Sequence, residues 1–289
     1  MIRSGLYLAV SKICFAAITA LLFALPLEAQ VRRGSLVVWI VSKQADYVVI
    51  GADSRTLNLD SKSTNDSGCK ILSLGGDTLF YETGTAGVGG YGGKSWTAAT
   101  TARNVYKSSL KRDALSLATE WRGRTLRWFD SLPDEEVRSH AQKMNGNLVS
   151  DGFINFGPDG SLSIHSVAIV YDARRRRLDV QSTSQGPGET GISGVALNLV
   201  AEFLQEKTDR AVKAFGPVGT LRFARGVNQS ADVDLIQKAI KFAMDNSVGE
   251  DKLALGGDID VAIIRKDHTI QWVARKPVCN QQDLKATPL

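Results

Sequence analysis

The stretch GSLVVWIVSKQADYVVIGADSR, residues 34–55, contains two runs of apolar, mostly β-branched residues separated by a short polar turn. The runs cover residues 36–43 and 47–54, and this pattern is typical of a β-hairpin. Apolar residues occupy consecutive positions in both runs, so each strand is expected to be buried on both faces. The stretch therefore predicts an interior hairpin in a sheet that is covered on both sides.

The remaining pattern predicts strands and helices that come in blocks. A second hairpin is expected around Gly75-Gly76-Asp77. In chain order, the other predictions are strands at 69–74 and 78–84, helices from about 94 to 144 with a break near Leu132-Pro133, strands at 153–157, 163–172 and 178–184, helices at about 194–208 and 231–247, and a hairpin at 258–273. This order argues against a parallel, doubly wound sheet. It predicts an α+β fold, a four-layer αββα sandwich of two antiparallel sheets with helix pairs outside.

Residues 1–29 are predicted to be a signal peptide. Their apolar run ICFAAITALLFALPL is short for a membrane span, and Ala29 is a suitable small residue before the cut. An uncleaved N-terminal anchor is the alternative, because Leu27 suits the position two residues earlier less well. A short propeptide or tail is predicted at residues 30–34. A single domain follows at residues 35–275, and a C-terminal tail at residues 276–289. The product would be exported, to the periplasm or outside the cell.

Composition argues against several functions. The net charge of +5 is mildly basic and gives little support for nucleic-acid binding. The three histidines are scattered without metal-ligand spacing, so neither a metal site nor a cofactor is predicted. Two cysteines, Cys69 and Cys279, follow the predicted signal, and one disulfide between them is an open alternative in an exported chain.

Two further motifs favour structural interpretations. GTAGVGGYGGKS, residues 84–95, resembles a phosphate-binding loop, but the required first glycine position is occupied by Val88. Nucleotide binding is therefore disfavoured, and a flexible helix entry is expected. ARRRRLD, residues 173–179, lies between two predicted strands. A solvated hairpin tip is favoured there over a polyanion site.

The segments SLVVWIVSK, YVVIGADSR, GCKI, TGTAG and GGDIDVAIIRKD occur in an order that resembles a proteasome β-subunit, within the N-terminal-nucleophile (Ntn) hydrolases. The resemblance runs from Gly34 to about Ile270. The extra N-terminal helix of the family's α-subunits is not evident, which favours the β type. Because the family forms rings, the resemblance also implies a homo-oligomer, although no ring contact can be identified in the sequence.

The resemblance implies a set of catalytic residues. It assigns the nucleophile to Ser35, the acid to Asp53, a nearby arginine to Arg55, the lysine to Lys70 and an oxyanion-binding amide to Gly84. A serine hydroxyl needs a base, and an α-amine freed by cleavage after Gly34 would supply one. A buried lysine, held by the aspartate, would stabilise the developing alkoxide. Each of these residues also has a purely structural alternative.

The resemblance further implies a specificity residue. The first specificity pocket of the family is tuned two residues before the oxyanion glycine, which corresponds to Glu82. Alternation along a strand places Glu82 on the same face as Gly84. An acid there would favour a basic side chain before the scissile bond. The alternative is that Glu82 pairs with a neighbouring basic residue.

Three positions depart from the family pattern around the nucleophile's amine. Pro187 stands nearest to an expected serine, Asp251 matches an expected aspartate only with a shift of one residue, and Leu255 replaces a second serine.

The leading hypothesis is an exported peptide or amide hydrolase acting on peptides or unfolded chains, without an ATP-driven partner. The alternative is a catalytically inactive Ntn-fold protein with a binding or assembly role.

Overall fold

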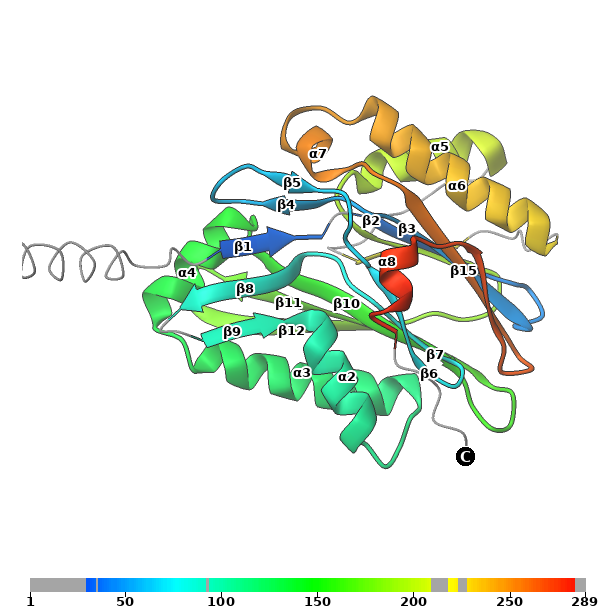
Figure 1. The fold of residues 1–289 in the computed structure, drawn as a ribbon, viewed down its shortest axis with the longest axis horizontal. Helices are drawn as coiled ribbons and strands as arrows, with labels where there is room; N and C mark the ends of the chain where they lie inside the picture. Colours follow the sequence, from blue (N-terminus) through cyan, green and yellow to red (C-terminus); the bar gives the residue numbers. More distant parts are fainter. Residues whose placement is uncertain (1–29, 35, 92–93, 209–217, 223–227, 284–289) are drawn as a thin grey trace, which may run out of the picture.

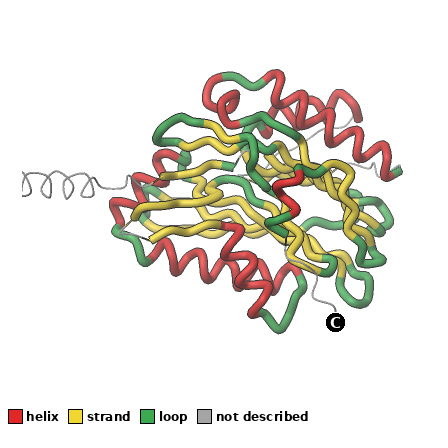
Figure 2. The backbone as a smooth tube through the Cα atoms, in the orientation of Figure 1, coloured by secondary structure: helices red, strands yellow, loops and turns green. Residues whose placement is uncertain are grey.

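The computed structural model describes residues 30–34, 36–91, 94–208, 218–222 and 228–283. Strands lie between two layers of helices, as the ribbon in Figure 1 and the tube in Figure 2 both show. The predicted α+β fold is confirmed: two large antiparallel sheets pack face to face, and each carries helices on its outer face.

The first of these two sheets contains the hairpin of residues 34–55. Its strands, in spatial order, are β14 (Val218–Arg222), β13 (Glu189–Gly194), β2 (Leu36–Val41), β3 (Tyr47–Asp53), β15 (Ile259–Arg265) and β16 (Ile270–Ala274). Its outer face is covered by α5 (Leu197–Thr208) and α6 (Gln229–Asn246), and the short helix α7 (Gly249–Ala254) follows α6. Every residue of β2 and β3 is buried, as predicted for a sheet covered on both sides.

The second sheet lies beneath the first. Its strands, in spatial order, are β12 (Arg177–Ser184), β11 (Leu162–Asp172), β10 (Asn147–Phe156), β7 (Thr78–Tyr81) and β6 (Ile71–Gly75). Its outer face packs against α2 (Ala98–Ser108), α3 (Ala114–Asp130) and α4 (Asp134–Lys143). Pro133 precedes α4, and three acidic residues occupy the first turn of that helix, where they suit its dipole.

Three hydrophobic clusters fill the spaces between these four layers. Alternation along β2 explains how one strand serves two of them: Val38 faces α5 and α6, whereas Trp39 faces the second sheet. The Trp39 ring lies 4.9 Å from that of Tyr81 on β7, measured between centroids. Phe80, the residue before Tyr81 in β7, packs on the opposite side, towards α3. The apolar strands thus hold the four layers together.

A third sheet was not predicted. It is formed, in spatial order, by β5 (Thr64–Asn65), β4 (Thr56–Asn58), β1 (Gln30–Arg33), β8 (Thr85–Tyr91) and β9 (Lys94–Thr97). The expected helix entry over 84–95 is therefore wrong, because most of this segment forms β8 and β9, and α2 begins only at Ala98. Glycine has low strand propensity, which conceals β8 in the sequence.

The segment after residue 275 is attached to the domain. A disulfide joins Cys279, in the short helix α8 (Pro277–Asn280), to Cys69 immediately before β6. Asp283 accepts hydrogen bonds from the Ser73 amide, at 2.8 Å, and from Arg275, at 2.6 Å. Up to residue 283, the segment predicted as a C-terminal tail thus packs against the second sheet. Within the described ranges, no helix combines the length and apolar character needed to cross a lipid bilayer.

Candidate active site

The predicted site residues come from the ends of strands in both large sheets. Asp53 is the last residue of β3, Lys70 precedes β6, and Gly84 follows β7. Leu36 begins β2, next to the end of β3 in the same hairpin. Ser35, the predicted nucleophile, lies outside the described residues, so the site is built from the residues on either side of it.

A buried ion pair forms the centre of the site. The Lys70 Nζ atom lies 2.5 Å from Asp53 Oδ1, and both side chains are completely buried. The Leu36 amide donates to the same carboxylate oxygen at 3.0 Å. Burial lowers the pKa of the Lys70 ammonium, and the charge of Asp53 acts in the opposite direction. A lysine–aspartate pair is thus fixed at the amino end of β2.

The second oxygen of Asp53 connects this pair to the loop before β15. Asp53 Oδ2 accepts hydrogen bonds from the Gly256 amide at 3.1 Å and from the Arg55 amide at 3.3 Å. The Arg55 guanidinium forms a bidentate ion pair with Asp66, at 2.6 and 2.9 Å, and donates to the Leu255 carbonyl at 3.1 Å. Arg55 therefore holds this loop through its guanidinium group and contacts Asp53 through its backbone amide.

Gly84 occupies a backbone conformation that other residues adopt only with strain. Its φ is +65°, and a Cβ atom at this position would lie 3.1 Å from the Ser150 amide nitrogen. The Gly34 amide donates a hydrogen bond to the Gly84 carbonyl at 2.6 Å. The chain just before the predicted cleavage point thus lies against the predicted oxyanion glycine. Gly34 itself has little room for a side chain, since its Cβ would lie 3.2 Å from Thr83 Cα.

A buried polar network supports the backbone before Gly84. The Thr83 amide donates to Asp151 Oδ1 at 2.9 Å, and the Thr83 hydroxyl donates to the Ser150 carbonyl. The hydroxyl oxygens of Thr83 and Ser193 lie 2.6 Å apart. All four residues are buried, so their hydrogen bonds are shielded from competing water. The network fixes the segment that presents the Gly84 backbone.

Ser193 and Asp151 are site residues that sequence reasoning missed. Ser193 lies on β13, which pairs with β2 so that Gly194 is opposite Leu36. It is a serine just before α5 and close to the start of β2, whereas Pro187 lies in the turn that precedes β13. The glycine-rich sequence of β13 concealed this strand. Gly191 is required there, because a Cβ atom would overlap the Trp39 ring at 2.0 Å.

Glu82 is buried beside the second sheet's helices. Its carboxylate accepts a hydrogen bond from the Ala99 amide, near the start of α2, and the charges of Arg103 and Lys70 favour its ionised form. Burial outweighs these effects and raises the pKa of Glu82 to about 7. The Oε2 atom of Glu82 has no hydrogen-bond partner among the described residues. Glu82 is therefore both anchored and able to accept one more hydrogen bond.

Asp151 is the second buried acid of this region. Burial, followed by the negative charge of Glu82, raises its pKa well above the ordinary value. Its Oδ2 atom has no hydrogen-bond partner within the described part of the chain. Two buried carboxyl groups thus flank Thr83, one preceding it in sequence and the other accepting its amide hydrogen bond. Their mutual repulsion disfavours ionisation of both at once.

Asp251 is not brought into this network. It lies partly exposed on α7, where its charge and that of Glu250 act on Arg33. Burial lowers the pKa of the Arg33 guanidinium, and the two acids oppose that effect. Among the described contacts, no hydrogen bond or ion pair joins the Asp251 side chain to Asp53 or Lys70. Its predicted supporting role therefore gains no contact here.

The disulfide tethers the lysine of the site to the C-terminal segment. Cys69, the residue before Lys70, is bonded to Cys279, which settles the alternative that the sequence left open. Lys276, two residues after the end of β16, forms a buried ion pair with Asp260 at 2.9 Å. In the described part of the chain, no group of three or more His, Cys, Asp or Glu side chains could hold a metal ion.

Comparisons with known proteins give similarity only at the level of structure. No family model and no curated protein sequence matches the chain. It is structurally similar to the Gly-1 mutant of Anbu from Hyphomicrobium sp. strain MC1, with 13% identity, a TM-score of 0.42, and coverage of 86% of this chain and 91% of that chain. It is also similar to Anbu, described as an ancestral β-subunit, from Yersinia bercovieri, with 9% identity and the same TM-score and coverage.

Proposed function

We propose that the chain is a proteasome-β-like hydrolase of peptide or amide bonds, with Ser35 as an N-terminal nucleophile after cleavage between Gly34 and Ser35. The observation that carries this proposal is the buried Asp53–Lys70 pair at the amino end of β2. The Leu36 amide donates to Asp53, so the carboxylate contacts the residue that follows the nucleophile. A buried ion pair at a strand end is costly to maintain for stability alone, which favours a functional role.

The chemistry divides between the pair and the freed amine. The hydroxyl oxygen of Ser35 attacks the substrate carbonyl carbon, and its proton passes to the α-amine of the same residue. The Lys70 ammonium stabilises the developing negative charge on the attacking oxygen, and Asp53 keeps this lysine charged and oriented. The amine then protonates the leaving nitrogen. Water hydrolyses the resulting acyl-enzyme and restores the serine.

The geometry around Gly84 supports both cleavage and catalysis. Gly34 already lies against Gly84 through the 2.6 Å hydrogen bond between its amide and the Gly84 carbonyl. Residues 30–33 are held next to it as β1, paired with β4 and β8. The residues just before the proposed cleavage point are thus held in β1, and the chain after β1 continues to Gly34 beside Gly84. Within the proposal, the Gly84 amide binds the oxyanion, an interaction worth about 3–4 kcal/mol.

Glu82 gives the proposed activity a substrate preference. Its unpartnered Oε2 atom and its position two residues before Gly84 favour a basic side chain before the scissile bond. An ammonium or guanidinium group would supply the missing hydrogen bond and favour the ionised carboxylate. A panel of fluorogenic peptides that differ only at this residue tests the preference. Equal rates for Arg, Lys and Leu peptides would remove it.

Export and assembly complete the proposal. The predicted signal peptide supports export, and the Cys69–Cys279 disulfide is typical of an oxidising compartment. Assembly into a homo-oligomer is proposed from the resemblance to proteasome β-subunits, because that family forms rings. Light scattering coupled to size-exclusion chromatography measures the oligomeric state directly, and a monomer at micromolar concentration would argue against assembly.

Ser35→Ala tests the nucleophile. We expect the processed wild-type chain to hydrolyse peptides and the S35A chain to lose that activity at unchanged unfolding temperature. Ser67→Ala is the matched control, because Ser67 is exposed and its hydroxyl bonds locally, to Asn65. Activity that is indifferent to S35A would favour the alternative function, a non-catalytic Ntn-fold protein that serves binding or assembly.

A further inference from the structure

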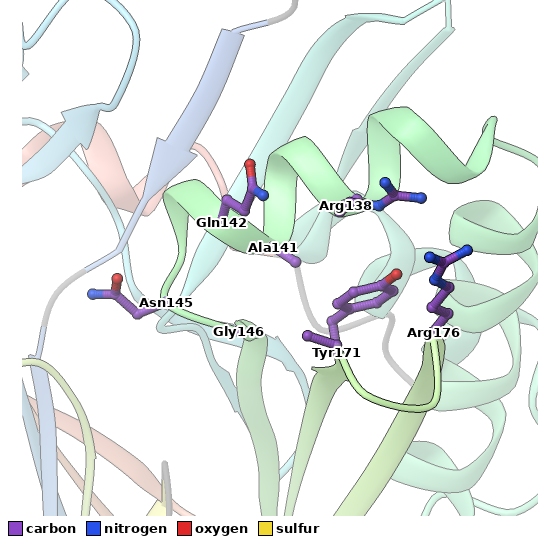
Figure 3. Close-up of a pocket in the computed structure, with 8 residues that line it drawn as sticks. Arg138, Ala141, Gln142, Asn145, Gly146, Tyr171 and Arg176 are labelled. Atoms are coloured by element: carbon purple, nitrogen blue, oxygen red, sulfur yellow. The ribbon is translucent and has the colours of Figure 1, made fainter.

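A cavity of about 370 Å³ lies at the end of α4, where that helix meets β10 and the turn between β11 and β12 (Figure 3). It shares no lining residue with the Asp53–Lys70 site. Its volume falls within the range of small-molecule sites in proteins. The lining residues are Arg138, Ala141, Gln142, Asn145, Gly146, Tyr171, Ala173 and Arg176. None of them is acidic, and two are cationic.

The two arginines reach the cavity from different elements. Arg138 belongs to α4, whereas Arg176 lies in the turn before β12. Figure 3 shows their guanidinium groups on the same side of the cavity, with the Tyr171 hydroxyl pointing towards them. A fork of N–H donors on each arginine suits the paired oxygens of a carboxylate or phosphate. The phenol of Tyr171 adds a hydrogen-bonding group and an aromatic face.

Arg176 differs from its neighbours in the arginine run of residues 173–179. Arg175 pairs with Asp172 at 3.6 Å, and Arg177 pairs with Asp179 at 2.9 Å. The described residues include no ion-pair partner for Arg176 or Arg138. Arg176 also has a positive φ of 53°, which directs the chain sharply at this turn. The turn thus pairs two of its arginines internally and leaves this one beside the cavity.

The floor of the cavity is fixed by the backbone. The Tyr171 amide donates to the Gly146 carbonyl at 2.8 Å, and the Gly146 amide donates to the Ala141 carbonyl at 2.7 Å. These bonds join the end of α4, the start of β10 and the end of β11. The floor of the cavity is therefore preformed, which lowers the entropic cost of binding a small ligand there.

We propose that this cavity binds a small molecule carrying a carboxylate or phosphate group, which Arg138 and Arg176 hold between them while Tyr171 contacts the body of the ligand. This ligand site is independent of the proposed hydrolase activity. The proposal gives the arginine run of residues 173–179 a role in ligand binding, which a solvated hairpin tip would not have. Gln142 and Asn145 supply amide groups at the rim for further hydrogen bonds.

Isothermal titration calorimetry of the full processed chain, at fixed ionic strength near the physiological value, tests the proposal. The probes are inorganic phosphate, phenyl phosphate, benzoate and citrate. Saturable binding of the phosphates alone or of the carboxylates alone supports the site and identifies its ligand class, and binding of both classes supports a general oxyanion site. We expect phenyl phosphate or benzoate to bind more tightly than inorganic phosphate if Tyr171 contacts the ligand body.

Variants locate the binding. Arg138→Gln and Arg176→Gln should each weaken it about tenfold or more, as expected for the loss of a charged hydrogen bond. Arg176→Lys keeps the charge but loses the paired donors, so an intermediate affinity is expected. The matched control is Arg174→Ala, in the same turn but outside the lining, which should bind as the wild type does. Absence of saturable binding with all four probes would overturn the proposal, as would equal losses in Arg174→Ala and Arg176→Gln.

Discussion

Glu82→Gln should change how the stability of the protein depends on pH. Burial raises the pKa of Glu82 from 4.5 to about 7, so the folded chain retains a proton that the unfolded chain releases over this interval. Stability therefore falls as pH rises from about 4.5 to about 7. At about 1.4 kcal/mol for each pKa unit, the full effect is about 3 kcal/mol. Glutamine cannot ionise, so the variant should lack this loss.

Urea unfolding at pH 5 and at pH 8 measures the effect for both chains. Because part of the effect is already lost at pH 5, the wild type should lose about 2.5 kcal/mol more than E82Q between these two values. Because the charge of Glu82 also raises the pKa of Asp151, E82Q relaxes that second acid as well. In the E82Q/D151N double variant neither of these two side chains can ionise, so the pH dependence of stability that remains comes from the rest of the protein. Glu135→Gln, on the exposed face of α4, is the matched control and should follow the wild type.

An identical pH dependence in the wild type and in E82Q would refute this reasoning. It would mean that Glu82 is as well solvated in the folded chain as in the unfolded one. The hydrogen bond from the Ala99 amide and the charge of Arg103 would then offset the whole cost of burial. A larger loss in E82Q than in the wild type would reverse the sign and refute it more strongly.

Further predictions concern the strand ends and the disulfide. Lys70→Met should leave Asp53 buried without its cation and lower the free energy of unfolding by about 3–5 kcal/mol, as measured by urea titration. A loss below about 1 kcal/mol, which is typical of a surface ion pair, would contradict the buried pairing. Gly84→Ala should cost about 1–2 kcal/mol because of its positive φ, whereas Gly89→Ala, with open space around it, should show no such strain; equal unfolding midpoints would contradict this difference. Cys69→Ser should lower the free energy of unfolding by about 2–5 kcal/mol. Thiol titration of the unfolded, unreduced wild-type chain should detect neither Cys69 nor Cys279; only Cys14 would react, in chains that keep the predicted signal.

The interior strands were predictable because their sequence follows directly from where they lie. Val38 and Trp39 are adjacent in β2 yet fill different hydrophobic clusters, and this arrangement requires apolar residues at consecutive positions. The same run identified the strand end at which Asp53 lies. Lys70 and Gly84 could be assigned through the family resemblance, since their spacing matches the family's without a gap.

The third sheet and β13 could not be predicted from local patterns. Their glycine-rich strands carry few of the side chains that distinguish a strand from a loop. Gly191 illustrates the reason: it is glycine because the Trp39 ring occupies the space of its side chain, a contact between distant parts of the sequence. Ser193 was missed together with its strand. The Cys69–Cys279 bond likewise depends on tertiary structure, since 210 residues separate the two cysteines.

The mature N-terminus tests the central claim most directly. The protein recovered from its native source, from both the cells and the surrounding medium, would be analysed by intact mass spectrometry and N-terminal sequencing. The proposed function predicts a chain that begins at Ser35, with the free amine that the serine requires as its base. A chain that begins at Gln30 or earlier would leave the serine inside the polypeptide and without that base. Such a result would contradict the hydrolase and favour a binding role for the same fold.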